Sequence, residues 1–249
     1  MPRANRYHLP GQVWHITHRC HNRDFLLKFR CDRNRYRDWL CEAKKRHGLR
    51  LLNYNLTCNH VHLLIYDEGH RGVIEDSLQL VAGRIAQEYN RRKGRVGAFW
   101  QGRYHATAVQ SGRHLRNCFT YIDLNMVRAG RAAHPSNWPS CGYQDLQQPR
   151  KRGVLLDIEC CADLLGLESA SELAHWQGSA IADALSIPHG RDPVWTESVA
   201  VGDTDYLKKV AGLLRSRSRF LKVVAKGSQL CLEERPSGYG ANLTAKMPI

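Results

Sequence analysis

Two histidines separated by one residue are the first feature of this sequence that could do metal chemistry. His60 and His62 alternate with Val61, Leu63 and Ile65 in an apolar segment. Side chains alternate along a strand, so both imidazoles should leave the same face, about 7 Å apart. One ion could bridge them if a third ligand came from elsewhere in the chain. The alternative is a pair of half-buried histidines on a polar sheet face.

A tyrosine later in the chain could act as a nucleophile towards a phosphodiester. Tyr121 and Asn125 are four residues apart in an expected helix, so their side chains should be neighbours. Asp123 should point about 200° away from Tyr121 on that helix. In the functional interpretation Tyr121 attacks the phosphate and the Asn125 amide oxygen is the third metal ligand. In the structural alternative, Tyr121 packs beside the apolar stripe of its helix.

The elements that must position these residues follow from hydrophobic periodicity. Alternation predicts strands at 13–19, 50–56, 60–66 and 98–109. Helical spacing predicts a helix from Asp32 to about 47 stopped by Gly48, a second from about 74 stopped by Gly94, and a third capped by Ser111. The order βαββαβ plus a helix predicts an α+β, ferredoxin-like antiparallel sheet with additional C-terminal helices. Its two middle strands would include the one that begins at His60.

Composition restricts the partners. The 249 residues contain 37 Lys and Arg against 23 Asp and Glu, a formal net charge of +14. This excess favours a polyanion, and nucleic acid is the commonest soluble one. An anionic membrane surface is the competing interpretation, but no apolar run approaches the roughly 20 residues that a membrane span needs. Nine cysteines without a C-x-x-C pair, and no secretory signal at Met1–Pro10, predict a cytoplasmic protein with reduced thiols.

Three segments resemble one family. They are N-H-V-H-L-L at Asn59–Leu64, F-W-Q-G-R-Y at Phe99–Tyr104 and Y-I-D-L-N-M-V-R-A-G at Tyr121–Gly130, and the opening Gly11–Asn22 is similar too. Together they resemble the HUH superfamily of single-tyrosine nucleases, and most closely the REP-associated tyrosine transposases. That resemblance implies a ferredoxin-like palm, cleavage and rejoining of single-stranded DNA near REP-type hairpins, and a covalent 5′-phosphotyrosine intermediate.

The resemblance also assigns residues. It makes His60 and His62 the metal pair, Tyr121 the nucleophile and Asn125 the amide ligand, although relatives often have Gln at that position. Where the family commonly has Pro, this chain has Met126, which lets the helix continue. Imidazoles alone favour zinc, whereas phosphodiester chemistry and an amide ligand favour Mg²⁺ or Mn²⁺. The resemblance selects Mg²⁺ or Mn²⁺, and it favours a monomer over a dimer.

Basic residues near these motifs are the candidate DNA contacts. A single-stranded DNA track needs cations and flat groups for stacking, and the candidates are Arg91, Arg92, Lys93, Arg95, Arg103, Arg116 and Arg128.

The predicted division is a nuclease domain at 1–135, a mostly helical extension at 136–225 and a tail at 226–249. The extension includes a basic helix at 205–220. It could grip a hairpin stem, or the tail could inhibit the enzyme, and the sequence does not choose between them.

Two other functions fit the same composition. The chain could be a regulator that binds hairpin DNA without cutting it, or a zinc-dependent RNA-binding protein. The first would be expected to have lost a histidine or the tyrosine, and all three are present.

Overall fold

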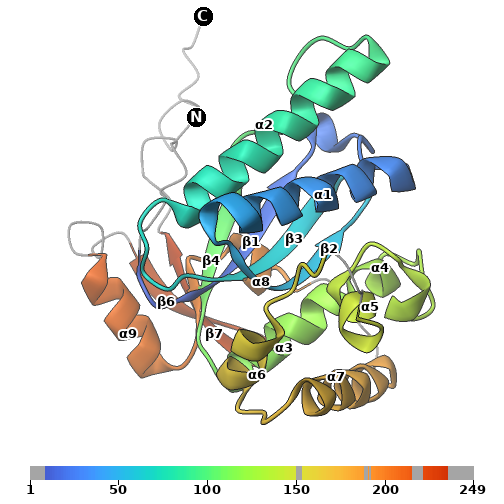
Figure 1. The fold of residues 1–249 in the computed structure, drawn as a ribbon. Helices are drawn as coiled ribbons and strands as arrows, with labels where there is room; N and C mark the ends of the chain where they lie inside the picture. The colour runs from blue at the N-terminus through green and yellow to red at the C-terminus, as the bar shows by residue number, and fades with distance from the viewer. Residues whose placement is uncertain (1–8, 150–152, 188–189, 191, 215–220, 235–249) are drawn as a thin grey trace, which may run out of the picture.

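The computed structural model describes residues 9–149, 153–187, 190, 192–214 and 221–234, and places a seven-stranded sheet at the centre of the chain (Figure 1). The strand order is β2-β3-β1-β4-β5-β7-β6. The strands are β1 (Val13–Arg19), β2 (Arg50–Leu56), β3 (His60–Tyr66), β4 (His105–Val109), β5 (Ala200–Val201), β6 (Leu221–Lys226) and β7 (Gln229–Glu234).

The first four strands form the expected ferredoxin-like palm. They run antiparallel in the order β2-β3-β1-β4, with β3 and β1 in the middle. The crossover helices α1 (Arg30–His47) and α2 (Val73–Lys93) pair across one face (Figure 1). Alternation in β1 and β3 gives that face Trp14, Ile16, Val61 and Leu63, all buried, which provides the apolar surface that such helices need.

Two expected helix caps need correction. Helix α1 begins at Arg30 after Phe29, so Asp32 is not its cap but lies in the first turn and pairs with Arg92. Helix α3 (Arg113–Asp123) follows Gly112 with no side-chain cap, so Ser111 does not cap it.

The strand expected at 98–109 begins only at His105, because residues before it anchor a loop on α2 instead. Trp100 donates its indole N–H to the Ala82 carbonyl at 3.0 Å, and the Phe99 ring meets Tyr89 edge to face.

The part after residue 135 is not only helical. It contains α5 (Gly142–Gln147), α6 (Ile158–Leu165), α7 (Ala170–Leu185), α8 (Val194–Glu197) and α9 (Thr204–Leu213). Strand β5 also pairs in parallel with β4, and β7 links β5 to β6, so this part continues the palm sheet. Within the expected tail at 226–249, Gln229–Glu234 form a strand of the sheet, β7. Residues 215–220 of the expected basic helix and 235–249 of the tail lie outside the described residues.

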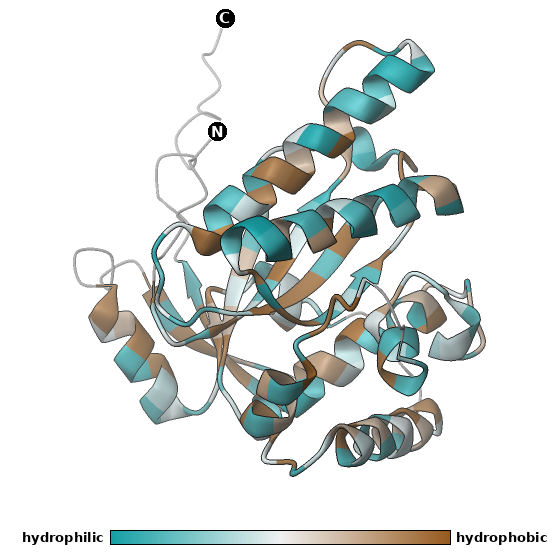
Figure 2. Cartoon of the chain, in the orientation of Figure 1, coloured by the Kyte–Doolittle hydropathy of each residue, from teal (hydrophilic) through white to brown (hydrophobic). Residues whose placement is uncertain are grey.

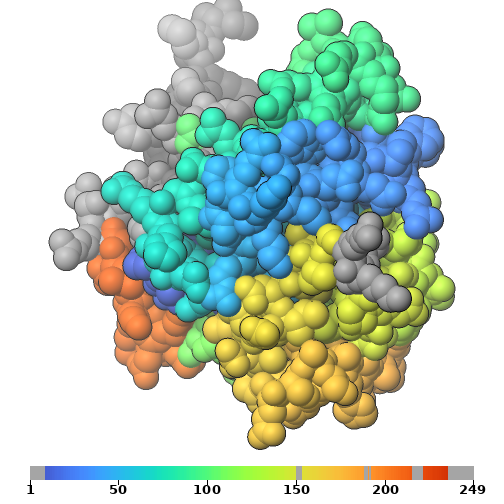
Figure 3. Space-filling view, viewed as in Figure 1, coloured from blue at the N-terminus to red at the C-terminus, as the bar shows by residue number. Residues whose placement is uncertain are grey.

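The N-terminal helices and the C-terminal part are packed together. Lys44 on α1 donates to the carbonyls of Val154, Leu155 and Leu156 at 3.2 to 3.3 Å. Figure 3 shows these differently coloured segments meeting without a break, and Figure 2 shows α1 with mostly hydrophilic residues towards the viewer. In the described part of the chain, no helix is long and apolar enough to cross a membrane.

Candidate metal and nucleophile site

The face of the palm opposite α1 and α2 carries a polar stripe. In the antiparallel register Thr17 lies opposite His62, and Arg19 lies opposite His60. Residues that face each other across an antiparallel pair project from the same side of the sheet. His15, two residues before Thr17, therefore shares this side with the two histidines. This stripe is the surface on which a site can form.

Helix α3 lies over the stripe because asparagines of β2 donate hydrogen bonds to its backbone and to one of its side chains. Asn55 donates to the Ile122 carbonyl at 2.9 Å, and Asn53 bonds to the Asp123 carboxylate at 3.0 Å. This docking places the ring of Tyr121 with its centroid 6.0 Å from that of His62 and 6.1 Å from that of His15. Tyr121 therefore lies close to the histidine pair in the structure, as the sequence suggested.

Three polar side chains form a chain of contacts through the site. His15 Nδ1 lies 2.7 Å from the Trp195 carbonyl oxygen, and His15 Nε2 lies 2.9 Å from His62 Nδ1. On the far side of the ring, His62 Nε2 lies 2.9 Å from the Asn125 amide. Asn125 begins the short helix α4 (Asn125–Arg128), directly after α3. The predicted partners His62 and Asn125 are therefore in contact.

His60 lies at the edge of the same cluster. Its ring centroid is 4.8 Å from that of His62, so the rings converge more than the strand repeat suggests. His60 Nδ1 lies 2.7 Å from Asn59 Oδ1 and 2.9 Å from Thr57 Oγ1. If Nδ1–H donates to the Asn59 oxygen, Nε2 is the acceptor nitrogen of this ring.

Burial keeps the inner histidines neutral. Desolvation lowers the pKa of His15 to about 3, against a weaker opposing effect of its bond to the Trp195 carbonyl. Desolvation, then the charges of His60 and His15, lower the pKa of His62 well below its ordinary value. A neutral imidazole is the form that binds a metal ion.

Arg128 was predicted as a DNA contact, and the structure places it against the nucleophile candidate. Its guanidinium carbon lies 3.9 Å from the centroid of the Tyr121 ring, and its Nη2 donates to the Tyr121 carbonyl. Burial lowers the pKa of Arg128, while the neighbouring Tyr121 raises it. A cation over an aromatic face attracts the ring and fixes its orientation.

These residues open into a pocket of about 590 Å³. Tyr121, His60, His62 and Asn125 line it. Its basic lining consists of Arg19, Arg23, Arg103 and Arg128, and the acidic Glu197 also faces it. The pocket can therefore hold an anion against both the tyrosine and the histidines.

The other predicted DNA contacts are not brought to this pocket. Arg91, Arg92 and Lys93 end α2, and Arg95 follows it. Arg92 is paired with Asp32, and Arg95 donates to Asn90 at 3.1 Å. Arg116 donates to the Leu165 carbonyl at 2.6 Å and lies over the Trp176 ring, so its guanidinium docks the C-terminal helices.

Two members of the contact chain that runs through His62 were missed from the sequence. His15 had a detectable signal, because it alternates with Trp14 and Ile16 and so belongs to the polar side of β1. Trp195 had none, since it contributes a backbone carbonyl from a segment 180 residues away. A pattern of side chains does not predict a backbone contact at that distance.

Any metal site here depends on the amide. Over the described ranges, no three His, Cys, Asp or Glu side chains are grouped to hold a metal ion. The donors that do converge are the imidazoles of His60 and His62 and the amide of Asn125. Rotating that amide exchanges its nitrogen for its oxygen, which is a ligand type that hard cations accept. The donor set therefore fits a divalent ion.

The palm carries the histidine pair on its central strand β3, and the helix with Tyr121 lies above it. Residues 10–125 match the model of the family described as IS200-like transposases. The family resemblance of the sequence is confirmed for that segment.

One solved structure shows the same fold for the palm. A REP-associated tyrosine transposase bound to a REP hairpin aligns with a TM-score of 0.50 and 19% identity, over 59% of this chain and 87% of that one. A putative transposase from Deinococcus radiodurans aligns with a TM-score of 0.34 and 18% identity, over 53% of this chain and 96% of that one. No curated protein matches.

Proposed function

We propose that this protein is a metal-dependent single-stranded DNA endonuclease and transposase, which cleaves and rejoins DNA near REP-like hairpins through Tyr121. One observation carries the proposal. A tyrosine ring lies 6.0 Å from a buried, neutral histidine in a pocket with four arginines. The segment 10–125, which matches the transposase family, contains all four residues proposed for the chemistry, with Asn125 as its last residue.

His60, His62 and Asn125 would hold the ion, which we propose to be Mg²⁺ or Mn²⁺. When bound, such an ion neutralises charge on the scissile phosphate and on the leaving oxygen. The amide oxygen and the phosphate oxygens favour these hard cations over zinc.

The side chains then have separate tasks in a transesterification. The Tyr121 oxygen loses its proton and forms a bond to phosphorus, while the bond from phosphorus to the 3′ oxygen breaks and that oxygen takes up a proton. The product is a 5′-phosphotyrosine and a free 3′-hydroxyl, and attack by a 3′-hydroxyl reverses the step. The Arg128 guanidinium, against the Tyr121 ring, stabilises the developing phenolate.

The neighbouring transposase with the same fold is bound to a REP hairpin, which supports hairpin DNA as the partner. All nine cysteines are free thiols, which supports a reducing compartment such as the cytoplasm. We propose a monomer as the working state, because one chain supplies all the residues of the site.

The decisive experiment uses hairpin oligonucleotides with single-stranded flanks, Mn²⁺ and a denaturing gel. The wild-type protein should give a covalent protein–DNA adduct that chelation of the metal prevents. Tyr121→Phe should give none, whereas Tyr143→Phe, a buried tyrosine outside the pocket, should behave like the wild type. Hairpin binding without any adduct would instead identify a non-cleaving regulator, and an adduct that survives in Tyr121→Phe would move the nucleophile elsewhere.

A further inference from the structure

His15 is fully buried, and its two ring nitrogens link the Trp195 carbonyl to the His62 ring. Nδ1 meets the Trp195 carbonyl at 2.7 Å and Nε2 meets His62 Nδ1 at 2.9 Å. The two imidazoles are nearly parallel, with an interplanar angle of 13°. The two rings are held in place by the paired backbones of β1 and β3, the adjacent strands that carry His15 and His62.

The carbonyl determines where each proton lies. A carbonyl oxygen only accepts, so the Nδ1 of neutral His15 must carry the hydrogen and its Nε2 must be an acceptor. His62 Nδ1 must then donate to that acceptor, which leaves His62 Nε2 with its lone pair towards Asn125. This is the nitrogen that a metal ligand needs, since orientation by a second hydrogen bond selects the ligating atom of a histidine.

We propose that His15, held by the Trp195 carbonyl, is a positioning residue that fixes the ring orientation and tautomer of His62 for metal binding. The inference rests on the proposed metal site. It also gives the C-terminal part a task in that site, because Trp195 lies in α8, outside the segment 10–125 that matches the transposase family. Asn59 serves His60 in the corresponding way.

The tautomer can be measured on the metal-free wild-type protein. Long-range ¹H–¹⁵N spectra of histidine-labelled protein at pH 8 distinguish Nδ1–H from Nε2–H imidazoles, with assignments from His15→Gln and His62→Gln. Both His15 and His62 should be Nδ1–H forms. An Nε2–H form at His62 would overturn the inference, whatever the protein does with DNA.

Calorimetric titration with Mn²⁺ supplies the second readout. His15→Leu should weaken Mn²⁺ binding by about 10- to 100-fold, and His15→Gln should recover part of it because its amide oxygen can accept the His62 proton. His114→Leu is the matched control, since His114 is also buried but contacts Gln229. Wild-type affinity in a folded His15→Leu protein would contradict the inference, whereas no Mn²⁺ binding by the wild type would contradict the proposed function instead.

A different observation concerns the segment that leaves the pocket after β1. Asn22 and Arg23 have φ angles of 51° and 62°, and no other non-glycine residue among those described has a positive φ. Side chains rarely adopt this region, and such residues cluster at functional sites. The turn is held by Asn59, whose amide donates to the Arg23 carbonyl at 3.0 Å, and Arg23 lines the pocket.

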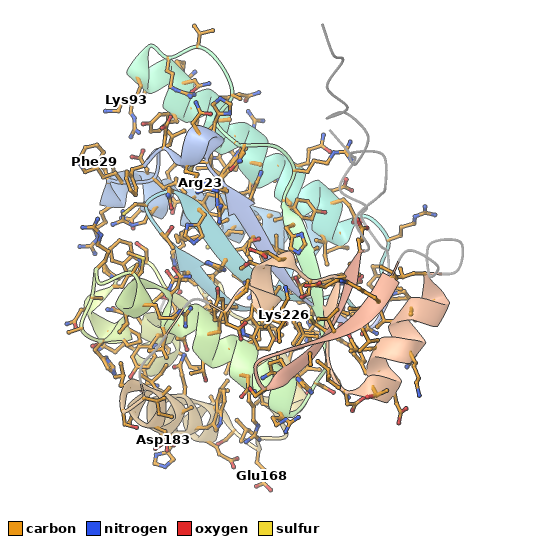
Figure 4. The ribbon with its side chains drawn as sticks, turned by 180° about the vertical axis from the view of Figure 1, so that it is seen from behind. Arg23, Phe29, Lys93, Glu168, Asp183 and Lys226 are labelled. Carbon is orange, nitrogen blue, oxygen red and sulfur yellow. The ribbon has the colours of Figure 1, made fainter. Side chains whose placement is uncertain are left out.

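Two aromatic rings follow this turn and face solvent. Phe25 is 59% exposed and Phe29 is 53% exposed. The ammonium groups of Lys28 and Lys93 lie 6.0 Å and 5.5 Å from the centroid of the Phe29 ring. Figure 4 shows Arg23, Phe29 and Lys93 towards the same end of the molecule, with Phe29 and Lys93 at its edge. Exposed rings within a basic surface have the composition of a surface that stacks bases and neutralises phosphates.

We infer that Phe25 and Phe29 form a stacking platform for the single-stranded DNA that extends from the active-site pocket. This inference also rests on the proposed function. It gives the basic end of α2, which the pocket does not use, a contact with the strand through Lys93.

The test is fluorescence anisotropy with a labelled single strand of mixed sequence and with its duplex. Phe25→Ala and Phe29→Ala should each weaken single-strand binding by about tenfold, while Phe29→Trp should retain it. Ile187→Ala, an exposed apolar residue elsewhere, should have no effect. The inference fails if the substitutions weaken duplex binding as much as single-strand binding, or if single-strand binding is unchanged. It also fails if the substitutions weaken only the binding of anionic vesicles or only self-association of the protein. The adduct assay on wild-type protein separates these outcomes from failure of the proposed function.

Discussion

The two flanks of helix α3 bury polar groups against the same sheet, yet they differ in what surrounds those groups. On one flank the Asp123 carboxylate accepts from Asn53 at 3.0 Å and from Gln177 at 2.8 Å, and it is 1% exposed. On the other, Tyr121 and Asn125 face His62 and open to the pocket. Only the second flank combines a nucleophile, neutral nitrogen donors and access for a substrate.

The difference shows that a perturbed titratable group does not by itself indicate a site. Burial raises the pKa of Asp123 to about 7, which is a large shift. Asp123 nevertheless lies outside the pocket that Tyr121 and the histidines line. Its two amide donors close the network, so Asp123 docks α7 on α3. The active flank is marked instead by donors that converge at an open pocket.

Removal of a proposed metal ligand should give the largest difference in Mn²⁺ affinity between the two flanks. His60→Gln should weaken Mn²⁺ binding by about 100-fold or more, because one of three donors is lost. Asp123→Asn should leave that affinity unchanged, since Asp123 contacts Asn53 and Gln177 rather than the pocket. Calorimetry measures both, and equal losses in the two variants would mean that the flanks are not independent.

The Asp123 flank should instead control stability as pH changes. Its pKa is raised from 3.8 to about 7 in the folded state, so its contribution is complete below about pH 3.8 and is lost as pH rises to about 7. The loss is on the order of 4 kcal/mol. Denaturant unfolding of Asp123→Asn should therefore show a smaller fall in free energy from pH 5 to pH 8 than the wild type.

The exposed Asp38→Asn is the control for that experiment and should retain the wild-type slope. His15 and His62 act in the opposite direction, because their lowered pKa values remove stability as pH falls below about 6.5. Their contribution is common to all three proteins and cancels in the comparison. An unchanged slope in Asp123→Asn would show that the carboxylate titrates normally.

The palm could be predicted from the sequence because its determinants are local. The alternation in β1 and β3, and Gly48 with a φ of 74° after α1, act within a few residues. The histidine pair and the spacing of Tyr121 and Asn125 were readable for the same reason. Strands β5 and β7 were not, because Ala200–Val201 is too short for a pattern and its position depends on β4, about 90 residues earlier.

The side chains of the site could be predicted from the sequence, but the contacts that hold them in position could not. The role of Trp195 depends on a backbone atom, and the positions of Arg116 and Arg128 depend on which side of α3 packs on the C-terminal helices. Both arginines flank the same helix in sequence, yet one lies on the Tyr121 ring and the other on Trp176. Charge alone predicted the same function for both.

Arg128 should affect the rate of cleavage rather than metal binding. Arg128→Gln should slow single-turnover adduct formation by about tenfold, because the phenolate loses its neighbouring cation. Arg128→Lys should have an intermediate rate, since it keeps the charge without the planar contact. Mn²⁺ affinity should stay at the wild-type value, and a change there would place Arg128 in the support of the metal ligands instead.

The smallest expected effects come from two arginines that the sequence treated as equivalent. Arg103 lines the pocket, so Arg103→Ala should weaken hairpin DNA binding several-fold and reduce the slope of log affinity against log salt by about 1. Arg116 donates to Leu165 and covers Trp176, so Arg116→Ala should lower the melting temperature by a few degrees and leave DNA affinity and its salt slope unchanged. Anisotropy titrations at three salt concentrations and thermal melts measure both. A salt-slope change in Arg116→Ala would extend the DNA surface to the α6 and α7 side of α3, and the contrast between its two flanks would then no longer hold for DNA binding.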